Sequence, residues 1–277
     1  MSIMNASHGT PDASIPDISG KNGHTSWVTL VTGAAAGIGK AITMRLLNQG
    51  HRVIAMDRDQ AALDALAGHS GIIPVAFDLS DLAGTPPLLQ QLIETHGPVR
   101  KLALNAGIWP GGPLIEMPIE TFMANLHVNL VSPFLFLRTA APAMRDAGGG
   151  AIVITASRNA FRSSTNNAGY DASKGGVVSL MRTAAGEFSA FNIRVNAVCP
   201  GVTATPGNAD CEAADFKNAY CRQIPLNRYA EADEIAAAAT FLLGDDASFI
   251  TGQTLIADGG QIACQDNGRM IPAAESD

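Results

Sequence analysis

The sequence predicts an α/β protein whose doubly wound sheet has seven parallel strands, with helices on both faces. Short runs rich in β-branched residues alternate with longer segments of helical periodicity, and turns bearing glycine or asparagine separate them. This alternation is typical of repeated strand–helix units. With 277 residues, of which 47% are hydrophobic, the chain can bury one large core. We therefore expect a single domain at 27–262, between flexible tails at 1–26 and 263–277.

The strands are expected at short, mostly apolar runs, and amphipathic helices fill the intervals between them. The runs are residues 27–31, 52–56, 72–77, 101–104, 151–155, 194–198 and 254–256. A helix at 40–48 follows the first run. Between the last two runs lies a long polar segment, residues 205–226, which we interpret as a lid over a binding site.

Composition excludes several classes of function. The net charge is −7, and no run of Lys or Arg provides the footprint of a protein that binds nucleic acid or an anionic membrane. No stretch is apolar enough for a membrane span or a signal peptide. The cysteines show no metal-binding spacing, so neither a zinc site nor any other metal is expected. We expect a reduced, cytoplasmic protein that acts on small molecules.

A glycine turn follows the first expected strand and leads into the first helix. Gly33 permits the tight turn, Gly37 lets the backbone approach a pyrophosphate, and Gly39 lets the helix pack on the strand. Asp57 ends the second strand, eighteen residues after Gly39, where a dinucleotide site needs a carboxylate for the adenosine ribose. Together these features predict a dinucleotide-binding Rossmann fold.

The glycine spacing Thr-Gly-x-x-x-Gly-x-Gly resembles that of the short-chain dehydrogenase/reductase family, and four further segments share the resemblance. They are Asn105-Ala106-Gly107, Asn129, Ser157 followed by Tyr170-x-x-x-Lys174, and the segment from Pro200 to Thr205. The match extends from about residue 28 to residue 260. The resemblance implies a Rossmann-fold oxidoreductase that uses a nicotinamide cofactor.

The resemblance also implies which residues contact the cofactor. Asn105 is expected to stabilise the central sheet, while Asp78 and Leu79 match the pair that contacts adenine. Asp78 could instead cap the turn after its strand. The full set is Gly33, Ala36, Gly37, Ile38, Gly39, Asp57, Arg58, Asp78, Leu79, Asn105, Ala106, Gly107, Tyr170, Lys174, Pro200, Gly201, Thr203 and Thr205.

Four residues are the expected catalytic set. Tyr170 and Lys174 are four apart and share one helix face. A nearby ammonium favours the phenolate of a tyrosine whose pKa is ordinarily about 10, so Lys174 is expected to make Tyr170 a better base. By resemblance, Lys174 also binds the nicotinamide ribose, and Ser157 holds the substrate oxygen. Asn129 would anchor a water that links Lys174 to solvent, or would satisfy a local kink of the backbone.

NAD is favoured over NADP as the cofactor. The carboxylate of Asp57 would repel a 2′-phosphate. Ala36 also stands where NADP-preferring relatives often have a basic residue. Arg58 argues the other way, because an arginine there can stack on adenine or bind a phosphate.

The expected substrate-binding residues are Ser157, Trp109, Asn159, Asn167 and Tyr170. Their polarity suits a sugar, a polyol or a cyclic diol. Two arginines in the same region, Arg158 and Arg162, could bind a carboxylate on such a substrate, although we favour solvated surface positions for both.

Three functions remain open. The first is an NAD-dependent dehydrogenase of a secondary alcohol, and the second is an NADPH-dependent reductase of the 3-oxoacyl-carrier-protein type. The third is a non-enzymatic regulator that senses dinucleotides, which the intact catalytic set makes the least favoured. By family analogy we expect a homodimer or homotetramer that pairs through helices at 118–144 and 169–190 and through the last strand.

Overall fold

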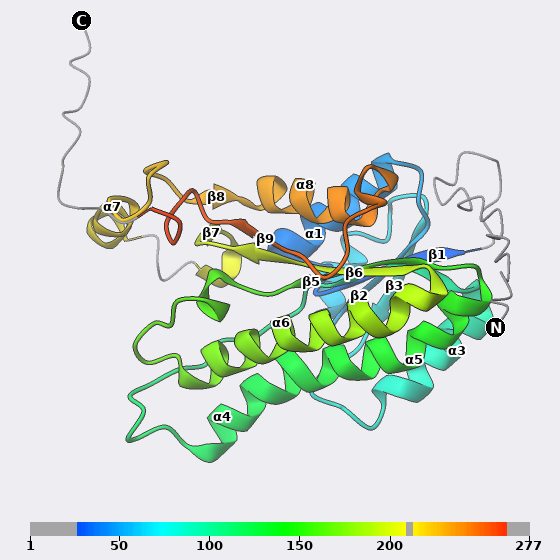
Figure 1. Cartoon of the computed structure of the whole chain (residues 1–277), viewed down its shortest axis with the longest axis horizontal. Coiled ribbons are helices and arrows are strands. Elements are labelled where there is room, and N and C mark those ends of the chain that lie inside the picture. The colour runs from blue at the N-terminus through cyan, green and yellow to red at the C-terminus, as the bar shows by residue number, and fades with distance from the viewer. Residues whose placement is uncertain (1–26, 209–212, 265–277) are drawn as a thin grey trace, which may run out of the picture.

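A seven-stranded parallel sheet is the centre of the molecule (Figure 1). The computed structural model describes residues 27–208 and 213–264. The strand order is β3-β2-β1-β4-β5-β6-β9, and every neighbouring pair is parallel. The expected tails lie outside the described residues, apart from the first two positions of the C-terminal one.

The strands confirm all seven predicted runs, with bounds that differ by at most two residues. Strands β1, β5 and β6 are buried along their whole length, which explains why they read as continuous apolar runs. The strands are β1 Val28–Thr32, β2 Val53–Asp57, β3 Ile72–Ala76, β4 Val99–Leu104, β5 Gly150–Thr155, β6 Ile193–Pro200 and β9 Thr254–Ala257.

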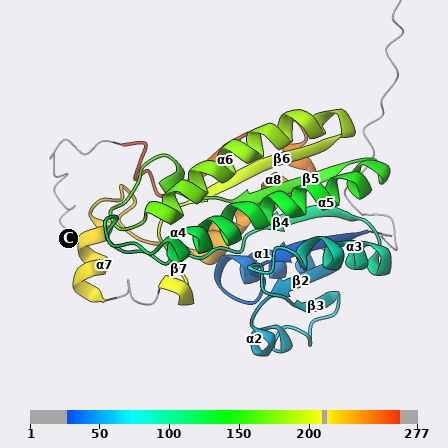
Figure 2. The same ribbon diagram turned by 90° about the horizontal axis from the view of Figure 1, so that it is seen from below.

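Helices cover both faces of this sheet. Helices α3, α5 and α6 pack on one face, and α1 and α8 on the other, as Figures 1 and 2 show. Phe136 and Met181 belong to the core of the first face, and Ile42 and Leu242 to that of the second. The helices are α1 Gly37–Asn48, α2 Gln60–Asp64, α3 Thr85–His96, α4 Ile119–Leu126, α5 Ser132–Asp146, α6 Ala168–Phe188, α7 Ala214–Cys221 and α8 Ala232–Leu243. Among the described helices, none is both long and apolar enough to cross a bilayer.

The helix expected at 118–144 is interrupted by a π turn, His127–Val131, which joins α4 to α5. Pro133 has no N–H to donate to the carbonyl of Asn129, four residues earlier, and the wider turn accommodates this gap. The π turn also places the Asn129 side chain against the loop after β4, where it bonds Ile108.

Two short strands form a separate parallel pair that the sequence does not predict. They are β7 Thr203–Ala204 and β8 Ala230–Glu231. Helix α7 lies within the polar segment 205–226, and Figure 1 shows it beyond the carboxyl ends of the sheet strands. The segment therefore lies at the end of the molecule where ligands bind in open α/β sheets.

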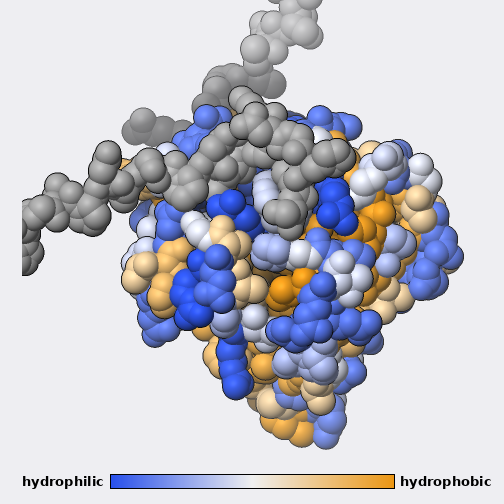
Figure 3. All heavy atoms as spheres, turned by 90° about the vertical axis from the view of Figure 1, so that its right-hand side faces the viewer, coloured by the Kyte–Doolittle hydropathy of each residue, from blue (hydrophilic) through white to orange (hydrophobic). Residues whose placement is uncertain are grey.

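The opposite end of the molecule carries the amino ends of the strands. Its surface mixes hydrophilic and hydrophobic residues (Figure 3). Beneath it, the buried Lys101 ammonium lies 3.3 Å from His51 Nε2 and 5.7 Å from the centre of the Trp27 ring. Burial, with a smaller contribution from the charge of Lys101, lowers the pKa of His51 to about 4.

Candidate active site

A groove runs along the carboxyl ends of the central strands. It consists of two adjoining cavities of about 630 and 750 Å³, which share Gly33, Ala106 and Gly107 in their walls. We call the first the Asp57 cavity and the second the Tyr170 cavity. The strand order reverses between β1 and β4, so the groove lies at the switch point where this fold class binds ligands.

The glycine turn after β1 forms the floor between the two cavities. Gly33 and Gly37 have φ angles of 64° and 50°, which side chains rarely adopt. A Cβ on Gly39 would collide with the carbonyl oxygen of Gly33, so this glycine serves the packing of α1 on β1. No side chain caps α1 at Ala36. The free N–H groups of its first turn, and the positive end of its dipole, therefore suit a pyrophosphate.

Asp57 is held rigidly in the wall of its cavity. Its Oδ2 accepts the Ala35 N–H at 3.0 Å, and its Oδ1 accepts the Asp59 N–H at 3.1 Å. Arg58 lines the same cavity and is exposed. The structure thus presents the carboxylate where a dinucleotide ribose is expected, with the arginine beside it.

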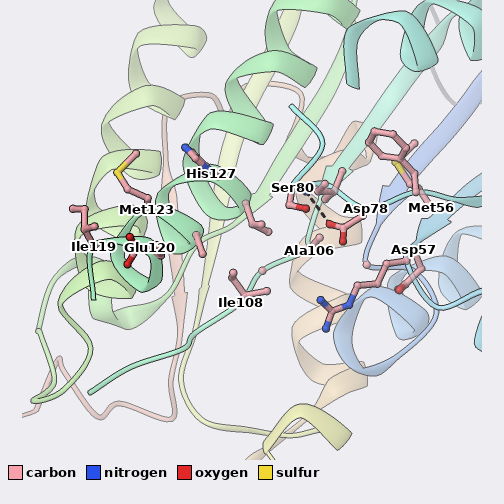
Figure 4. A pocket seen from close by; sticks show the side chains of 17 residues that line it. Met56, Asp57, Asp78, Ser80, Ala106, Ile108, Ile119, Glu120, Met123 and His127 are labelled. Carbon is pink, nitrogen blue, oxygen red and sulfur yellow. Dashed lines mark hydrogen bonds between the residues drawn. The ribbon is translucent and has the colours of Figure 1, made fainter. Parts of the chain in front are cut away.

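The Asp57 cavity extends from the sheet to helix α4. In Figure 4, Asp57 and Asp78 lie on the sheet side, and Ile119 and Met123 lie on the side of α4. Asp78 Oδ1 accepts the Ser80 N–H at 2.9 Å, and its pKa is lowered chiefly by its bonds with Ser80. Asp78 therefore caps its turn and also lines the cavity, so both interpretations of this residue apply. Leu79 is buried in the same wall.

Asn105 joins three strands at the centre of the groove. Its Nδ2 donates to the Thr32 carbonyl at 3.3 Å, and its Oδ1 accepts the Thr155 hydroxyl at 3.1 Å. Its N–H also donates to the Thr32 hydroxyl at 3.0 Å. These bonds connect the carboxyl ends of β1, β4 and β5, as the resemblance implies for this residue.

Ser157, Tyr170 and Lys174 meet in the Tyr170 cavity. The Lys174 ammonium donates to the Thr155 carbonyl at 2.8 Å and lies 5.6 Å from the centre of the Tyr170 ring. The side chains of Tyr170 and Ser157 are hydrogen-bonded to each other. The structure therefore brings together the three residues that the sequence singles out for proton transfer.

The electrostatics of the three differ from the expectation in one respect. Burial raises the pKa of Tyr170, against the Ser157 bond and the charge of Arg158, which both lower it. Burial lowers the pKa of Lys174 to about 8.

Asn129 lies directly behind the groove rather than in its wall. Its Oδ1 accepts the Ile108 N–H at 2.9 Å, and its Nδ2 donates to the Ile108 carbonyl at 2.8 Å and to Ser173 Oγ at 3.0 Å. A Cβ on Gly107 would lie 3.2 Å from Asn129 Oδ1 and 3.4 Å from Lys174 Nζ. Asn129 is thus close to Lys174, and its bonds to Ile108 also hold the backbone beside the π turn.

The segment from Pro200 to Thr205 contributes unevenly to the groove. Pro200, Gly201 and Thr205 line the Tyr170 cavity, and Thr205 lies against Gly37. Thr203 lies outside its lining, and the Thr203 hydroxyl donates to the Gly201 carbonyl at 3.2 Å. The remaining predicted contacts Ala36, Ile38, Asn105 and Ala106 line the cavity.

The expected substrate-binding residues also line the Tyr170 cavity, but they are not equally available. Trp109 lies against Gly207, so that a Cβ on the glycine would be 2.7 Å from the indole ring. Asn167 lines the wall. Asn159 is buried, and its Nδ2 donates to Asp171 at 2.7 Å, so it chiefly shapes the loop after β5.

The two arginines near Ser157 occupy different environments. Arg162 is exposed, as expected. Arg158 is not a solvated surface residue: it lines the Tyr170 cavity, and its Nη2 donates to the Tyr220 hydroxyl at 2.6 Å. Tyr220 and Phe216 of α7 line the same cavity and were missed by sequence reasoning. Their four-residue spacing on one helix face, within the segment interpreted as a lid, is the signal that could have indicated them.

Comparison with known proteins gives consistent matches. The family model described as enoyl-(acyl carrier protein) reductase matches residues 33–261. A 3-oxoacyl-[acyl-carrier-protein] reductase of Thermotoga maritima is 34% identical, covering 85% of this chain and 97% of its own length. A cis-4-hydroxycyclohexanecarboxylate dehydrogenase of Sinomonas cyclohexanicum is 36% identical, covering 85% and 96%. The crystal structure of levodione reductase superposes with a TM-score of 0.82 at 32% identity, covering 87% of this chain and 99% of that one.

Proposed function

Because this chain belongs to the short-chain dehydrogenase/reductase family of oxidoreductases, we propose that it interconverts a secondary alcohol and a ketone on a small polar substrate, with NAD as cofactor. One observation carries the proposal. Ser157, Tyr170 and Lys174 converge in a cavity that is continuous with the glycine turn and with Asp57. This arrangement offers a proton-transfer site beside a dinucleotide groove.

The side chains divide the work of proton transfer. When bound, the nicotinamide cofactor supplies the ring that accepts or gives up the hydride. Ser157 hydrogen-bonds the substrate oxygen, and Tyr170 takes the alcohol proton during oxidation or donates it during reduction. Lys174 would hold the nicotinamide ribose. With Asn129 it would pass the proton on to solvent.

The pKa of Tyr170 has a consequence for the direction of the reaction. Burial keeps the phenol protonated at neutral pH, which suits it to donate a proton to a ketone. Oxidation requires the phenolate and is therefore favoured at alkaline pH. The Ser157 bond and the Arg158 charge both lower the pKa of Tyr170, so the phenolate forms at a lower pH than burial alone would allow.

The geometry of Asp57 supports NAD over NADP. Two backbone N–H groups fix its carboxylate, so it cannot easily turn away from a 2′-phosphate. Arg58 is exposed beside it and would be free to contact the adenine.

The walls of the Tyr170 cavity support a small polar substrate such as a sugar, a polyol or a cyclic diol. Ser164, Thr165 and Asn167 present hydroxyl and amide groups there. By its name, the Sinomonas relative acts on a small cyclic hydroxy acid. The second candidate, reduction of a 3-oxoacyl carrier protein with NADPH, is favoured by the Thermotoga relative and opposed by Asp57.

A substrate panel tests this proposal. Sugars, polyols, cyclic diols, hydroxy acids and 3-hydroxyacyl thioesters are offered to the full-length protein with NAD or NADP, and absorbance reports the reduced cofactor. We expect turnover of one of the first four classes, with NAD preferred. Activity confined to the thioesters, with NADP preferred, would instead establish the second candidate.

A further inference from the structure

Arg158 places a positive charge in the substrate region of the groove. It directly follows Ser157 in the chain and lines the Tyr170 cavity. Its side chain is partly buried, between the buried residues Ser157 and Asn159. Its position is fixed from the other side of the cavity, because its Nη2 donates to the Tyr220 hydroxyl on α7 at 2.6 Å.

No carboxylate in the described part of the chain pairs with Arg158. The nearby Asp171 is engaged elsewhere, since Asn159 Nδ2 donates to its Oδ1 at 2.7 Å and the Ser164 N–H to its Oδ2 at 2.8 Å. The one hydrogen-bond partner of the Arg158 guanidinium in the described residues is a neutral phenol. A guanidinium has five N–H donors, and the Tyr220 bond occupies one of them.

Three other arginines show how this chain can satisfy a guanidinium, whereas Arg100 keeps a buried Nη2 without a partner among the described residues. Arg45 and Arg228 each form a two-pronged pair with a carboxylate, Asp233 and Glu234 respectively. The buried Arg194 donates to the backbone carbonyls of Leu242, Gly244 and Ile250, at and after the C-terminal end of α8. Arg158 has neither arrangement, although it is partly withdrawn from water, where an uncompensated charge is costly.

We infer that Arg158 binds a carboxylate of the substrate, so that the enzyme acts on small hydroxy acids and the corresponding keto acids. The guanidinium donates to the carboxylate oxygens, and the Tyr220 hydroxyl, which only accepts in the present bond, supplies a second donor. The inference rests on the proposed function, whose substrate class it narrows.

Arg158 lies in the same cavity as the residues proposed to transfer the proton. Its charge lowers the pKa of Tyr170, so the guanidinium lies within electrostatic reach of the phenol that handles the alcohol proton. A carboxylate bound there would lie in the same cavity as the hydroxyl that reacts at Tyr170. Tyr220 belongs to α7, so binding of the acid would also connect the 205–226 segment to the loop after β5.

Direct binding tests the inference without requiring turnover. Calorimetry measures a graded set of carboxylates, from propionate to cyclohexanecarboxylate, against their neutral primary amides on the full-length protein saturated with NADH. We expect at least one acid to bind about ten- to a hundredfold more tightly than its amide. In Arg158→Gln this preference should vanish, and in Arg158→Lys part of it should return. Tyr220→Phe should reduce the preference for the acid over its amide by a smaller factor than Arg158→Gln does.

Arg162→Gln is the matched control, because it removes the same charge from an exposed position of the same loop. It should bind acids as the unaltered protein does. Equal binding of acids and amides by the unaltered protein, or an acid preference that survives in Arg158→Gln, overturns the inference. Failure to bind any acid overturns it as well.

The substrate panel separates the two levels of failure. If neutral alcohols are oxidised but no acid is preferred, the proposed function stands and the carboxylate site does not. If acids bind through Arg158 but no alcohol in the panel reacts, the carboxylate site stands and the proposed function fails.

Discussion

At the scale of single residues, Asp57 is the residue expected to decide between NAD and NADP. Its carboxylate is fixed by the N–H groups of Ala35 and Asp59, so its charge acts at one point of the groove. Replacing it by asparagine keeps the shape and removes the repulsion of a phosphate. We expect Asp57→Asn to narrow the ratio of kcat/KM for NAD over NADP by about tenfold or more.

Steady-state kinetics with both cofactors measures this ratio. Asp64→Asn, on the exposed side of α2, removes the same charge away from the groove and should leave the ratio unchanged. A preference for NADP in the unaltered enzyme would contradict the role assigned to Asp57.

His51 predicts a pH dependence of stability that is independent of catalysis. Its pKa is about 4 in the folded protein and 6.5 ordinarily, so the unfolded chain binds the proton more readily. The stabilisation is complete above pH 6.5 and is lost as the pH falls toward 4. By linkage this one group accounts for up to about 3 kcal/mol of the free energy of unfolding.

Urea unfolding at a series of pH values measures that loss. Between pH 6.5 and 4, the free energy of unfolding should fall less in His51→Gln than in the unaltered protein. His69→Gln, which alters an exposed histidine, should follow the unaltered protein. An identical pH dependence for all three would contradict the burial of His51 beside Lys101.

At the scale of elements, the π turn between α4 and α5 joins the fold to the site. Asn129 makes three hydrogen bonds there, two to Ile108 and one to Ser173. In Asn129→Ala the N–H and carbonyl of Ile108 lose their partners beside the cofactor groove. We expect the free energy of unfolding to fall by about 2–4 kcal/mol, because buried polar groups are left unpaired.

Denaturant titration checks this value. Gln91→Ala, at an exposed position of α3, should change the free energy of unfolding by less than about 0.5 kcal/mol. An equally small change in Asn129→Ala would show that the side chain does not support the turn.

The elements also show what the sequence could predict. The strands were predictable because burial on both faces leaves continuous apolar runs. The meeting of Ser157, Tyr170 and Lys174 in one cavity was predictable because their spacing resembles that of the family. The contact between Arg158 and Tyr220 was not, because it joins residues 62 positions apart through a helix with little pattern of its own. The pKa values of Tyr170 and Lys174 likewise depend on burial, which a local motif does not encode.

At the scale of the whole molecule, the β9 edge of the sheet is apolar and partly exposed. Strand β9 is the last strand of the sheet, and Leu255 and Ile256 on it are 39% and 38% exposed, while the nearby Phe249 is fully exposed. An apolar strand edge of this kind favours association with a second copy. It agrees with the homodimer or homotetramer expected from family analogy, in which the last strand takes part.

Light scattering tests this expectation. We expect a mass at least twice the 28.7 kDa of one chain. Ile256→Glu should reduce it, because a buried charge opposes association. Ala61→Glu places the same charge on α2, beside the opposite edge of the sheet, and should not. A mass of one chain for the unaltered protein would contradict the expected association through β9.

The central claim is that Tyr170 transfers the alcohol proton beside a bound nicotinamide, and Tyr170→Phe tests it most directly. The change removes one hydroxyl and leaves the groove intact. With an alcohol identified from the panel, turnover should fall by about a hundredfold or more, while the Kd for NADH changes less than about twofold. Turnover that survives in Tyr170→Phe with unchanged NADH binding would contradict the claim.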